Sequence, residues 1–297
     1  MRIDIHDVGH GACAVVTAPN GARIMLDCGL GLDPAWFPSI SYGGQFIDLL
    51  VITNLDEDHV CDLPYLWRDV RLGGVFSNPT VTGSALASMK SKHGMKEGVT
   101  LAHNLLNERG SGTIGQLPSL GEVRGWCCWN RYGSDFSDTN NLSLATFLRW
   151  GRFTILFGGD LEAAGWRALL RIPGLAADLA TVNIYVASHH GRESGCCAEL
   201  FEHMRPDIVM FSDDARRYAT QETDAWYRQR VRGIVDFDKP AGIFGQPKRH
   251  VMTTRRDGAM TILVNEAGGY TVTTYPKSPT TLFDAFSPKQ TASSLLR

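Results

Sequence analysis

Short apolar segments separated by polar turns run along most of this chain, and several of them end abruptly in carboxylates and histidines. Residues 49–52 form a continuous run of branched side chains, which is typical of a strand buried on both faces of a sheet. Within a few positions this strand is followed by Asn54, Asp56, Glu57, Asp58 and His59. A polar loop at the end of a strand can present metal ligands, although alone it is equally consistent with a solvated acidic turn.

Two later segments repeat this arrangement. Residues 153–157 predict a strand that runs into Gly158-Gly159-Asp160, followed by an amphipathic helix over 161–172. Residues 182–187 predict a third strand, which ends in Ser188-His189-His190-Gly191 before a helix over about 197–204. Because three strand ends supply so many carboxylates and imidazoles, we predict a metal site where they meet. The residues of this predicted site are Asp56, Asp58, His59, Asp160, His189 and His190.

The other segments indicate an α+β protein. Alternation and turn residues predict strands over 2–8, 13–18, 23–26, 74–77, 123–129, 142–149, 208–211, 249–254, 260–264 and 270–274, and helices over 62–68 and 223–231. Two sets of strands around one site fit a two-sheet sandwich with helices outside. We expect residues 1–275 to form one domain, with an insertion or helical cap at about 79–120, and residues 276–297 to form an irregular or packed-down tail.

Composition and net charge indicate an ordinary globular protein and do not identify what it binds. The chain has 297 residues, of which 43% are hydrophobic and 20% charged, so it can bury a large core. Its formal net charge of −2 does not indicate a general nucleic-acid binder, and a local basic rim would be needed for that role. The residues that could form such a rim, or be solvated instead, are Arg228, Arg230, Arg232, Lys248, Arg249, Arg255 and Arg256.

Cysteine usage and hydropathy predict a cytoplasmic protein without a membrane partner. The seven cysteines are odd in number and none has the C-x-x-C spacing, which favours a reducing compartment over a disulfide framework. No apolar run approaches the length that crosses a bilayer.

Seven stretches, taken in order, resemble the metallo-β-lactamase fold superfamily, and specifically the hydrolase domain of ComEC-type DNA-uptake proteins. Each motif alone is weak, but their shared order over nearly the whole chain is specific. The stretches are DVGHG at 7–11, MLDCG at 25–29, TNLDEDH at 53–59, NNLSL at 140–144, GGDLE at 158–162, SHHG at 188–191 and TRRDGAM at 254–260.

The resemblance implies an αββα four-layer sandwich with one or two divalent metal ions at the strand ends. Carried over by position, Asp58, His59 and one histidine of the His189-His190 pair would bind one ion, and Asp160 would bridge it to a first ion held by Asp56. Such a centre holds a hydroxide and stabilises the charge that develops on the attacked group. Asp58 and Asp160 are therefore the predicted catalytic residues.

The chain departs from the family pattern at the first metal position. Asn54 stands where the family has a histidine, and Thr220 replaces a second histidine, while Tyr218 keeps an aromatic position. The first ion would then rely on Asp56, Asp160 and either Asn54 or Asn140, oxygen ligands that favour manganese or magnesium over zinc. The second position could hold zinc or manganese. Residues expected to support the ligands or to contact substrate are His10, Asp27, Asn140, Asn141 and Tyr218.

The leading functional prediction is a stand-alone metal-dependent phosphodiesterase or nuclease that acts on nucleic acid or a nucleotide. One alternative is hydrolysis of a small ester, amide or cyclic nucleotide. The other alternative is a non-catalytic partner or sensor in a multi-protein system. Asn54 and Thr220 motivate it, because each stands where the family has a histidine and a neutral amide is a poor metal ligand.

Overall fold

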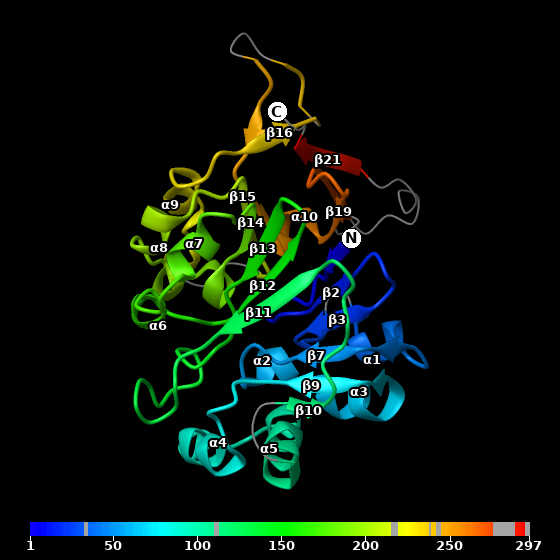
Figure 1. The fold of residues 1–297 in the computed structure, drawn as a ribbon, viewed down its shortest axis with the longest axis vertical. Helices are drawn as coiled ribbons and strands as arrows, with labels where there is room; N and C mark the ends of the chain where they lie inside the picture. Colours follow the sequence, from blue (N-terminus) through cyan, green and yellow to red (C-terminus); the bar gives the residue numbers. More distant parts are fainter. Residues whose placement is uncertain are drawn as a thin grey trace.

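Two large β-sheets form the centre of the molecule (Figure 1). The computed structural model describes residues 1–32, 35–109, 113–214, 219–237, 239–241, 245–275 and 289–294. Within these residues the larger sheet has eleven strands. In spatial order they are β10 (Thr113–Gly115), β9 (Gly74–Phe76), β7 (Leu49–Val51), β3 (Arg23–Leu26), β2 (Ala14–Thr17), β1 (Arg2–Ile5), β19 (Ala259–Val264), β20 (Tyr270–Tyr275), β21 (Lys289–Ser294), β16 (Ile234–Asp236) and β17 (Lys248–Arg249).

The smaller sheet has six strands, and two minor two-stranded ribbons lie outside both sheets. The six are β11 (Arg124–Cys128), β12 (Ala145–Trp150), β13 (Phe153–Phe157), β14 (Ile184–Val186), β15 (Ile208–Phe211) and β18 (Val251–Thr253). The ribbons pair β4 (Gly31–Leu32) with β5 (Ala35–Trp36) and β6 (Phe46–Ile47) with β8 (Arg71–Leu72).

Each large sheet contains a parallel portion. Strands β3, β7 and β9 are parallel in the larger sheet, and β13, β14, β15 and β18 are parallel in the smaller one. The carboxyl ends of parallel strands lie at the same edge of a sheet, where loops can supply convergent side chains. The three polar strand ends predicted from the sequence follow β7, β13 and β14, so they belong to these parallel portions.

Helices cover the outer face of each sheet (Figure 1). On the side of the larger sheet lie α1 (Pro38–Ser41), α2 (Glu57–Val60), α3 (Leu63–Asp69), α4 (Gly83–Lys90) and α5 (Glu97–Arg109). On the side of the smaller sheet lie α6 (Ala163–Leu169), α7 (Leu175–Leu179), α8 (Leu200–His203) and α9 (Asp224–Arg228). The remaining short helices are α10 (Thr254–Asp257) and the 3₁₀ turns η1 (Ser188–Gly191), η2 (Glu193–Gly195) and η3 (Ala219–Gln221).

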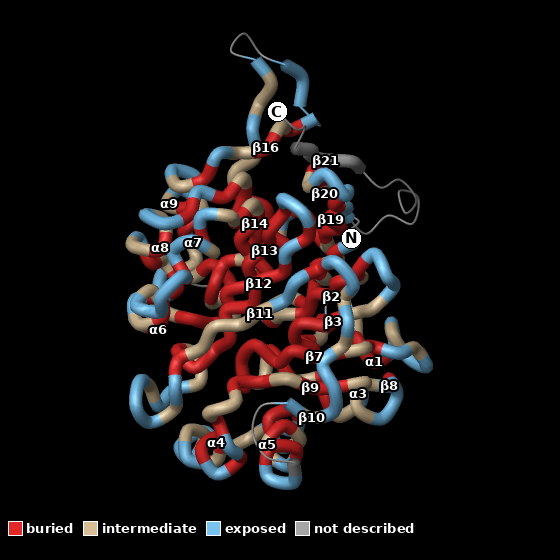
Figure 2. The backbone as a smooth tube through the Cα atoms, viewed as in Figure 1, coloured by how far each residue is buried: buried red, intermediate tan, exposed pale blue. Residues whose placement is uncertain are grey.

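Three hydrophobic cores hold these layers together. The first fills the space between the sheets, the second joins the larger sheet to its helices, and the third joins the smaller sheet to its helices. Successive side chains of one strand enter different cores: Val51 points between the sheets and Leu50 towards the helices. In β13, Ile155 and Leu156 alternate in the same way. The buried interior runs through both sheets (Figure 2), and the order of layers is αββα, as predicted.

The residues expected to form an insertion or cap at 79–120 contain α4, α5 and β10. Strand β10 pairs with β9 and so extends the larger sheet, while Leu86 and Ala102 of the two helices enter the core on its outer face. This segment is therefore built into the outer layer of the sandwich.

Several sequence expectations differ from the structure. The helices expected over about 197–204 and over 223–231 are shorter and span Leu200–His203 and Asp224–Arg228. Residues 289–294, expected in an irregular tail, form β21, because the edge of β20 offers unpaired backbone groups to which a strand can bind. The rest of that tail, 276–288 and 295–297, lies outside the described residues. The helix expected over 161–172 is confined to Ala163–Leu169, because the residues before it form the turn that carries Asp160. No helix in the described part of the chain combines the length and apolarity needed to cross a bilayer.

Candidate metal centre

Four side chains from three strand ends converge at the edge shared by the two sheets. Asp58 and His59 lie on α2, just after β7, while Asp160 follows β13 and His190 lies in η1 after β14. One ligand atom from each of the four lies within 4.8 Å of the others. The ligands therefore come from both sheets, two from the larger and two from the smaller.

The backbone at this edge adopts conformations that L-residues rarely occupy. The non-glycine residues with positive φ among those described are Asp27, His189 and His190, at 60°, 52° and 55°. Such strained residues persist where the surrounding structure enforces them, and they concentrate at functional sites. Gly159 also has positive φ, and a Cβ there would lie 2.9 Å from Cβ of Ser143, so only glycine lets the chain turn here towards Asp160.

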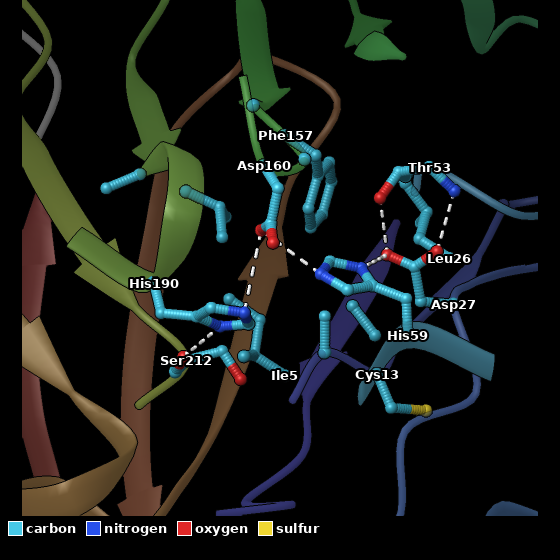
Figure 3. Close-up of a pocket in the computed structure, with 16 residues that line it drawn as sticks. Ile5, Cys13, Leu26, Asp27, Thr53, His59, Phe157, Asp160, His190 and Ser212 are labelled. Atoms are coloured by element: carbon cyan, nitrogen blue, oxygen red, sulfur yellow. Dashed lines mark hydrogen bonds and ion pairs between the residues drawn. The ribbon is translucent and has the colours of Figure 1, made fainter. Parts of the chain in front are cut away.

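Each histidine of the group is held by a hydrogen bond on its far nitrogen (Figure 3). Nδ1 of His59 lies 2.9 Å from Oδ2 of Asp27, which also accepts the hydroxyl of Thr53. Nδ1 of His190 lies 2.8 Å from the carbonyl oxygen of Ser212. Because both acceptors require a proton on Nδ1, each ring would present the lone pair of Nε2 to the centre once a cation replaced the proton there, as in metal-binding histidines.

Among the described residues, the buried atoms that face the centre form no hydrogen bond, although they lie close to one another. Nε2 of His59, Nε2 of His190 and Oδ1 of Asp160 are buried and unsatisfied. Nε2 of His59 lies 3.1 Å and Nε2 of His190 lies 3.5 Å from Oδ1 of Asp160. A buried unsatisfied polar atom costs about 1–3 kcal/mol, so three of them around one point need an explanation. A divalent metal ion explains them, because two imidazole nitrogens and two carboxylates are suitable ligands.

The electrostatics of the group also fit a cation. Burial alone would lower the pKa of His59, but the carboxylates of Asp160 and Asp27 outweigh it and raise that pKa well above its ordinary value. Burial alone would raise the pKa of Asp160, but His59 and His190 outweigh it and lower that pKa. Both carboxylates of the group therefore stay ionised, and a metal ion would replace protons on the histidines. A cavity of about 40 Å³ beside His59, Asp160 and His190 has room for a water-sized species.

Three of the predicted ligands lie outside this group. Oδ1 of Asp56 contacts the ammonium of Lys90 and accepts the hydroxyl of Thr139 at 2.7 Å. Asn54 bonds to Asn140 at 3.2 Å and to the backbone of Asp56 at 2.8 Å. The structure thus brings together four of the seven predicted ligands.

Of the two adjacent histidines, only His190 faces the other ligands. Nδ1 of His189 forms a hydrogen bond of 2.8 Å with the hydroxyl of Ser194 and lies 3.7 Å from Oε1 of Glu162. Two successive residues with left-handed backbone direct their side chains to different sides, which the sequence motif alone does not reveal.

The residues expected to support the ligands have distinct positions. Asp27 orients His59, and Nε2 of His10 lies 3.4 Å from Oδ2 of Asp58, with its ring 4.6 Å from that of His190. Asn141 accepts the backbone N–H of Gly165 and so ties the preceding loop to α6. Tyr218 lies outside the described residues, and Thr220 is an exposed residue of η3.

Sequence reasoning missed two charged residues at the site. The guanidinium of Arg192 lies 3.2 Å from Nε2 of His10, and its buried Nε has no hydrogen-bond partner in the described part of the chain. Lys90 reaches Asp56 from a helix 34 positions further along. Arg192 follows the SHHG motif directly and could have been singled out on that ground, whereas nothing in the sequence connects Lys90 with Asp56.

Most of the residues that could form a basic rim contact acidic or aromatic side chains of the protein. Arg249 and Arg256 contact Asp257, Arg255 contacts Asp213, and Arg232 contacts Asp207. Arg230 stacks on Trp226 at 3.9 Å. These groups therefore have partners within the protein, although Arg228, Lys248, Arg249 and Arg256 also line one cavity of about 320 Å³.

An αββα sandwich with a His/Asp cluster at the shared edge of its sheets defines the metallo-β-lactamase fold. No family model and no curated protein matches the sequence. Among solved structures, the fold is similar to that of the CmlA β-hydroxylase E377D mutant, with a TM-score of 0.50 and 14% identity over 87% of this chain and 53% of that one. This chain therefore spans about half the length of that relative.

Two further solved structures are similar at lower scores. Zinc-bound PqqB from Methylobacterium extorquens has a TM-score of 0.42 and 12% identity over 78% of this chain and 97% of that one. A diphosphatase of the PhnP family has a TM-score of 0.37 and 10% identity over 83% of this chain and 82% of that one. At such identities the likeness concerns the fold, and the narrower resemblance to ComEC-type domains remains a prediction from the motifs.

Proposed function

We propose that this chain is a metal-dependent hydrolase of phosphoester bonds, a phosphodiesterase or nuclease. The observation that carries the proposal is the convergence of His59, His190 and Asp160 through buried atoms that face one another and make no hydrogen bond among the described residues. Such a preorganised set of ligands serves to hold a cation, which in hydrolases activates water and stabilises developing negative charge.

Among the four ligands, Asp58 has the most accessible side chain. It is 25% exposed, whereas those of His190 and Asp160 are each 4% exposed. Its carboxylate therefore lies where water and substrate arrive, and it can orient the attacking water by accepting a hydrogen bond from it. The other three residues are held by their buried contacts and keep the geometry fixed, which lowers the cost of reorganisation during the reaction.

Arg192 supports a phosphoester as the substrate class. It lies beside His10, which in turn lies beside Asp58, so a guanidinium is available near the accessible ligand. Burial lowers the pKa of His10 to about 4, so this ring is neutral near pH 7 and can accept a hydrogen bond from Arg192. A guanidinium held in this way is suited to the paired oxygens of a phosphate.

A cleavage assay in manganese tests the proposal. The substrates are single-stranded DNA, duplex DNA and bis(4-nitrophenyl) phosphate, with 4-nitrophenyl acetate and a cyclic nucleotide as alternatives. Asp160→Asn and His190→Gln should lower phosphodiester cleavage by at least about 100-fold, and Arg192→Met by about 10-fold through a higher KM. The matched controls are Asp69→Asn, in an exposed pair with Arg68, and His103→Gln, on α5. Equal cleavage by the wild type and Asp160→Asn would contradict the proposal.

The other outcomes identify the alternative functions. Cleavage of the acetate or the cyclic nucleotide, but of no DNA, would indicate a small-molecule hydrolase. Absence of cleavage by a metal-loaded protein would favour a non-catalytic partner or sensor, a function that the ion pair of Asp56 with Lys90 supports.

We propose that the protein acts in the cytoplasm, with nucleic acid or a nucleotide as its substrate.

A further inference from the structure

Three carboxylates of one short motif have three different partners. Asp56, Glu57 and Asp58 are adjacent at the start of α2, yet only Asp58 belongs to the candidate metal centre. Glu57 accepts the backbone N–H groups of Gly98 and Val99 at 3.3 and 3.1 Å, at the first turn of α5. Asp56 binds Lys90, the last residue of α4. Two of the three carboxylates therefore attach α4 and α5 to the start of α2, the helix that carries Asp58 and His59.

The contact between Asp56 and Lys90 is an ion pair with limited access to solvent. The side chain of Lys90 is 18% exposed and that of Asp56 is 25% exposed. Thr139 donates to the same oxygen of Asp56 at 2.7 Å and lies 3.5 Å from the ammonium of Lys90. A partly desolvated pair that shares a third polar partner is more strongly held than a surface pair.

Asn54 is engaged in a similar way. It is 2% exposed, its amide nitrogen donates to Asn140, and its amide oxygen accepts the backbone N–H of Asp56. The position that the resemblance assigns to a first metal ion is thus filled by groups that satisfy one another. The other position differs, because three buried atoms there make no hydrogen bond in the described part of the chain.

We propose that the centre holds a single divalent ion, bound by Asp58, His59, Asp160 and His190, and that the ammonium of Lys90 supplies the positive charge at Asp56 in place of a second ion. The inference rests on the proposed metal centre but not on the substrate. Lys90 acts as a positioning residue. Its charge balances that of Asp56, and the ion pair holds α4 against the start of α2, which carries Asp58 and His59.

Metal stoichiometry tests this inference. After equilibrium dialysis against Mn²⁺ or Zn²⁺, the metal content of the folded monomer should be one ion per chain for the wild type. Asp56→Asn and Lys90→Met should also bind one ion, with affinities within a few-fold of the wild type. His190→Gln should lose at least 10-fold in affinity. Two ions in the wild type, or loss of an ion in Asp56→Asn, would overturn the inference.

Thermal unfolding provides a second readout, which does not depend on activity. Asp56→Asn and Lys90→Met should each lower the Tm, and the double variant should lower it no further than the more damaging single change, because one interaction is lost in all three. The matched control is the exposed pair of Arg167 and Glu199, for which both single changes should be close to neutral. Fully additive losses at Asp56 and Lys90 would show that the two residues do not act as a pair and would overturn the role of Lys90.

The results separate this inference from the proposed function. One ion per chain without hydrolysis of any substrate would leave the inference standing and remove the proposed function. Two ions per chain with phosphodiester cleavage would do the reverse. A wild type that binds no ion would remove both.

Discussion

At the scale of single residues, Asp27 shows how a group that does not face the centre can control it. Its carboxylate accepts three hydrogen bonds, from the backbone and hydroxyl of Thr53 and from His59. It is 2% exposed and has positive φ, so its position is fixed by the fold. Such a partner sets the tautomer and direction of the ligand histidine.

Replacement of Asp27 should weaken metal binding while the fold persists. Asp27→Asn keeps the size of the side chain and tolerates the left-handed backbone, but it removes the negative charge beside His59. We expect the metal Kd to rise about 10- to 100-fold, measured by competition with a chromophoric chelator. Asp69→Asn, on the surface, serves as the control. An unchanged Kd in a folded Asp27→Asn protein would show that His59 does not depend on this contact.

His6 provides a pH-dependent contribution to stability. Its ring stacks on Trp36 at 4.0 Å and bonds to the hydroxyl of Tyr42 at 2.9 Å. Burial lowers the pKa of His6 to about 4, against an ordinary value of 6.5, and Arg2 lowers it further while Asp4 opposes the shift. The pKa of His6 is lower in the folded protein than in the unfolded chain. The stability that depends on neutral His6 is therefore fully present above pH 6.5 and is lost progressively as the pH falls from 6.5 through 4.

A comparison of wild type and His6→Phe isolates this effect. The linkage relation gives a loss of about 2 kcal/mol from the free energy of unfolding of the wild type between pH 7 and pH 5, in excess of the loss in the variant. The Phe ring can still stack on Trp36 but does not titrate. Urea unfolding at both pH values measures the difference, and metal release or other carboxylates affect both proteins equally. Parallel losses in the two proteins would contradict the assignment.

At the scale of elements, α2, which carries Asp58 and His59, packs closely against α5. A Cβ at Gly98 would lie 2.2 Å from the carbonyl oxygen of Val60, so the helices approach at a distance that only glycine permits. The carboxylate of Glu57 caps the start of α5 at the same place. A negative group at a helix N-terminus is stabilising because the N–H groups there are otherwise unsatisfied.

Gly98→Ala should therefore push α5 away from α2. We expect a loss of about 1–3 kcal/mol in the free energy of unfolding, the usual cost of forcing an extra carbon into a packed contact. Asn104→Ala, at an exposed position of the same helix, should change stability by less than about 0.5 kcal/mol. Chemical denaturation of both variants provides the comparison, and equal stabilities would show that the junction can relax.

At the scale of the whole molecule, the four residues of the candidate metal centre come from both sheets. Asp58 and His59 follow a strand of the larger sheet, and Asp160 and His190 follow strands of the smaller one. The first core already holds the sheets face to face, and the centre adds a link at their shared edge. An ion that binds the folded state alone stabilises it according to its concentration relative to its Kd.

Removal of metal should lower the Tm of the wild type. A free ion concentration of about 100 times Kd stabilises the folded state by about 2.7 kcal/mol. For a chain of 297 residues that corresponds to a shift of roughly 4 °C, measured by calorimetry before and after chelation. Asp160→Asn, which lacks one ligand, should show little change on chelation. An equal shift in that variant would mean that the ion binds elsewhere.

Much of the fold follows from local patterns. Strands such as residues 49–52 and 153–157 are recognisable because both faces are apolar, and the polar groups after them mark the edge at which they end. The pairing of β21 with β20 was not predictable, because a Ser/Thr-rich segment gains its strand structure from the edge that it joins. Helix ends were also misplaced where turns at the site took up residues from the adjoining helix.

The sequence by itself determined the layers and the kinds of ligand at each strand end, because periodicity and residue type are local properties. Only the tertiary structure decided which ligands face one another. Asp56 and Asp58 are two positions apart on one helical turn, so their side chains point in different directions and meet different partners. The partner of Asp56, Lys90, comes from a distant helix, and His189 and His190 diverge through their backbone conformation. Convergence at the site depends on long-range packing, which no local pattern encodes.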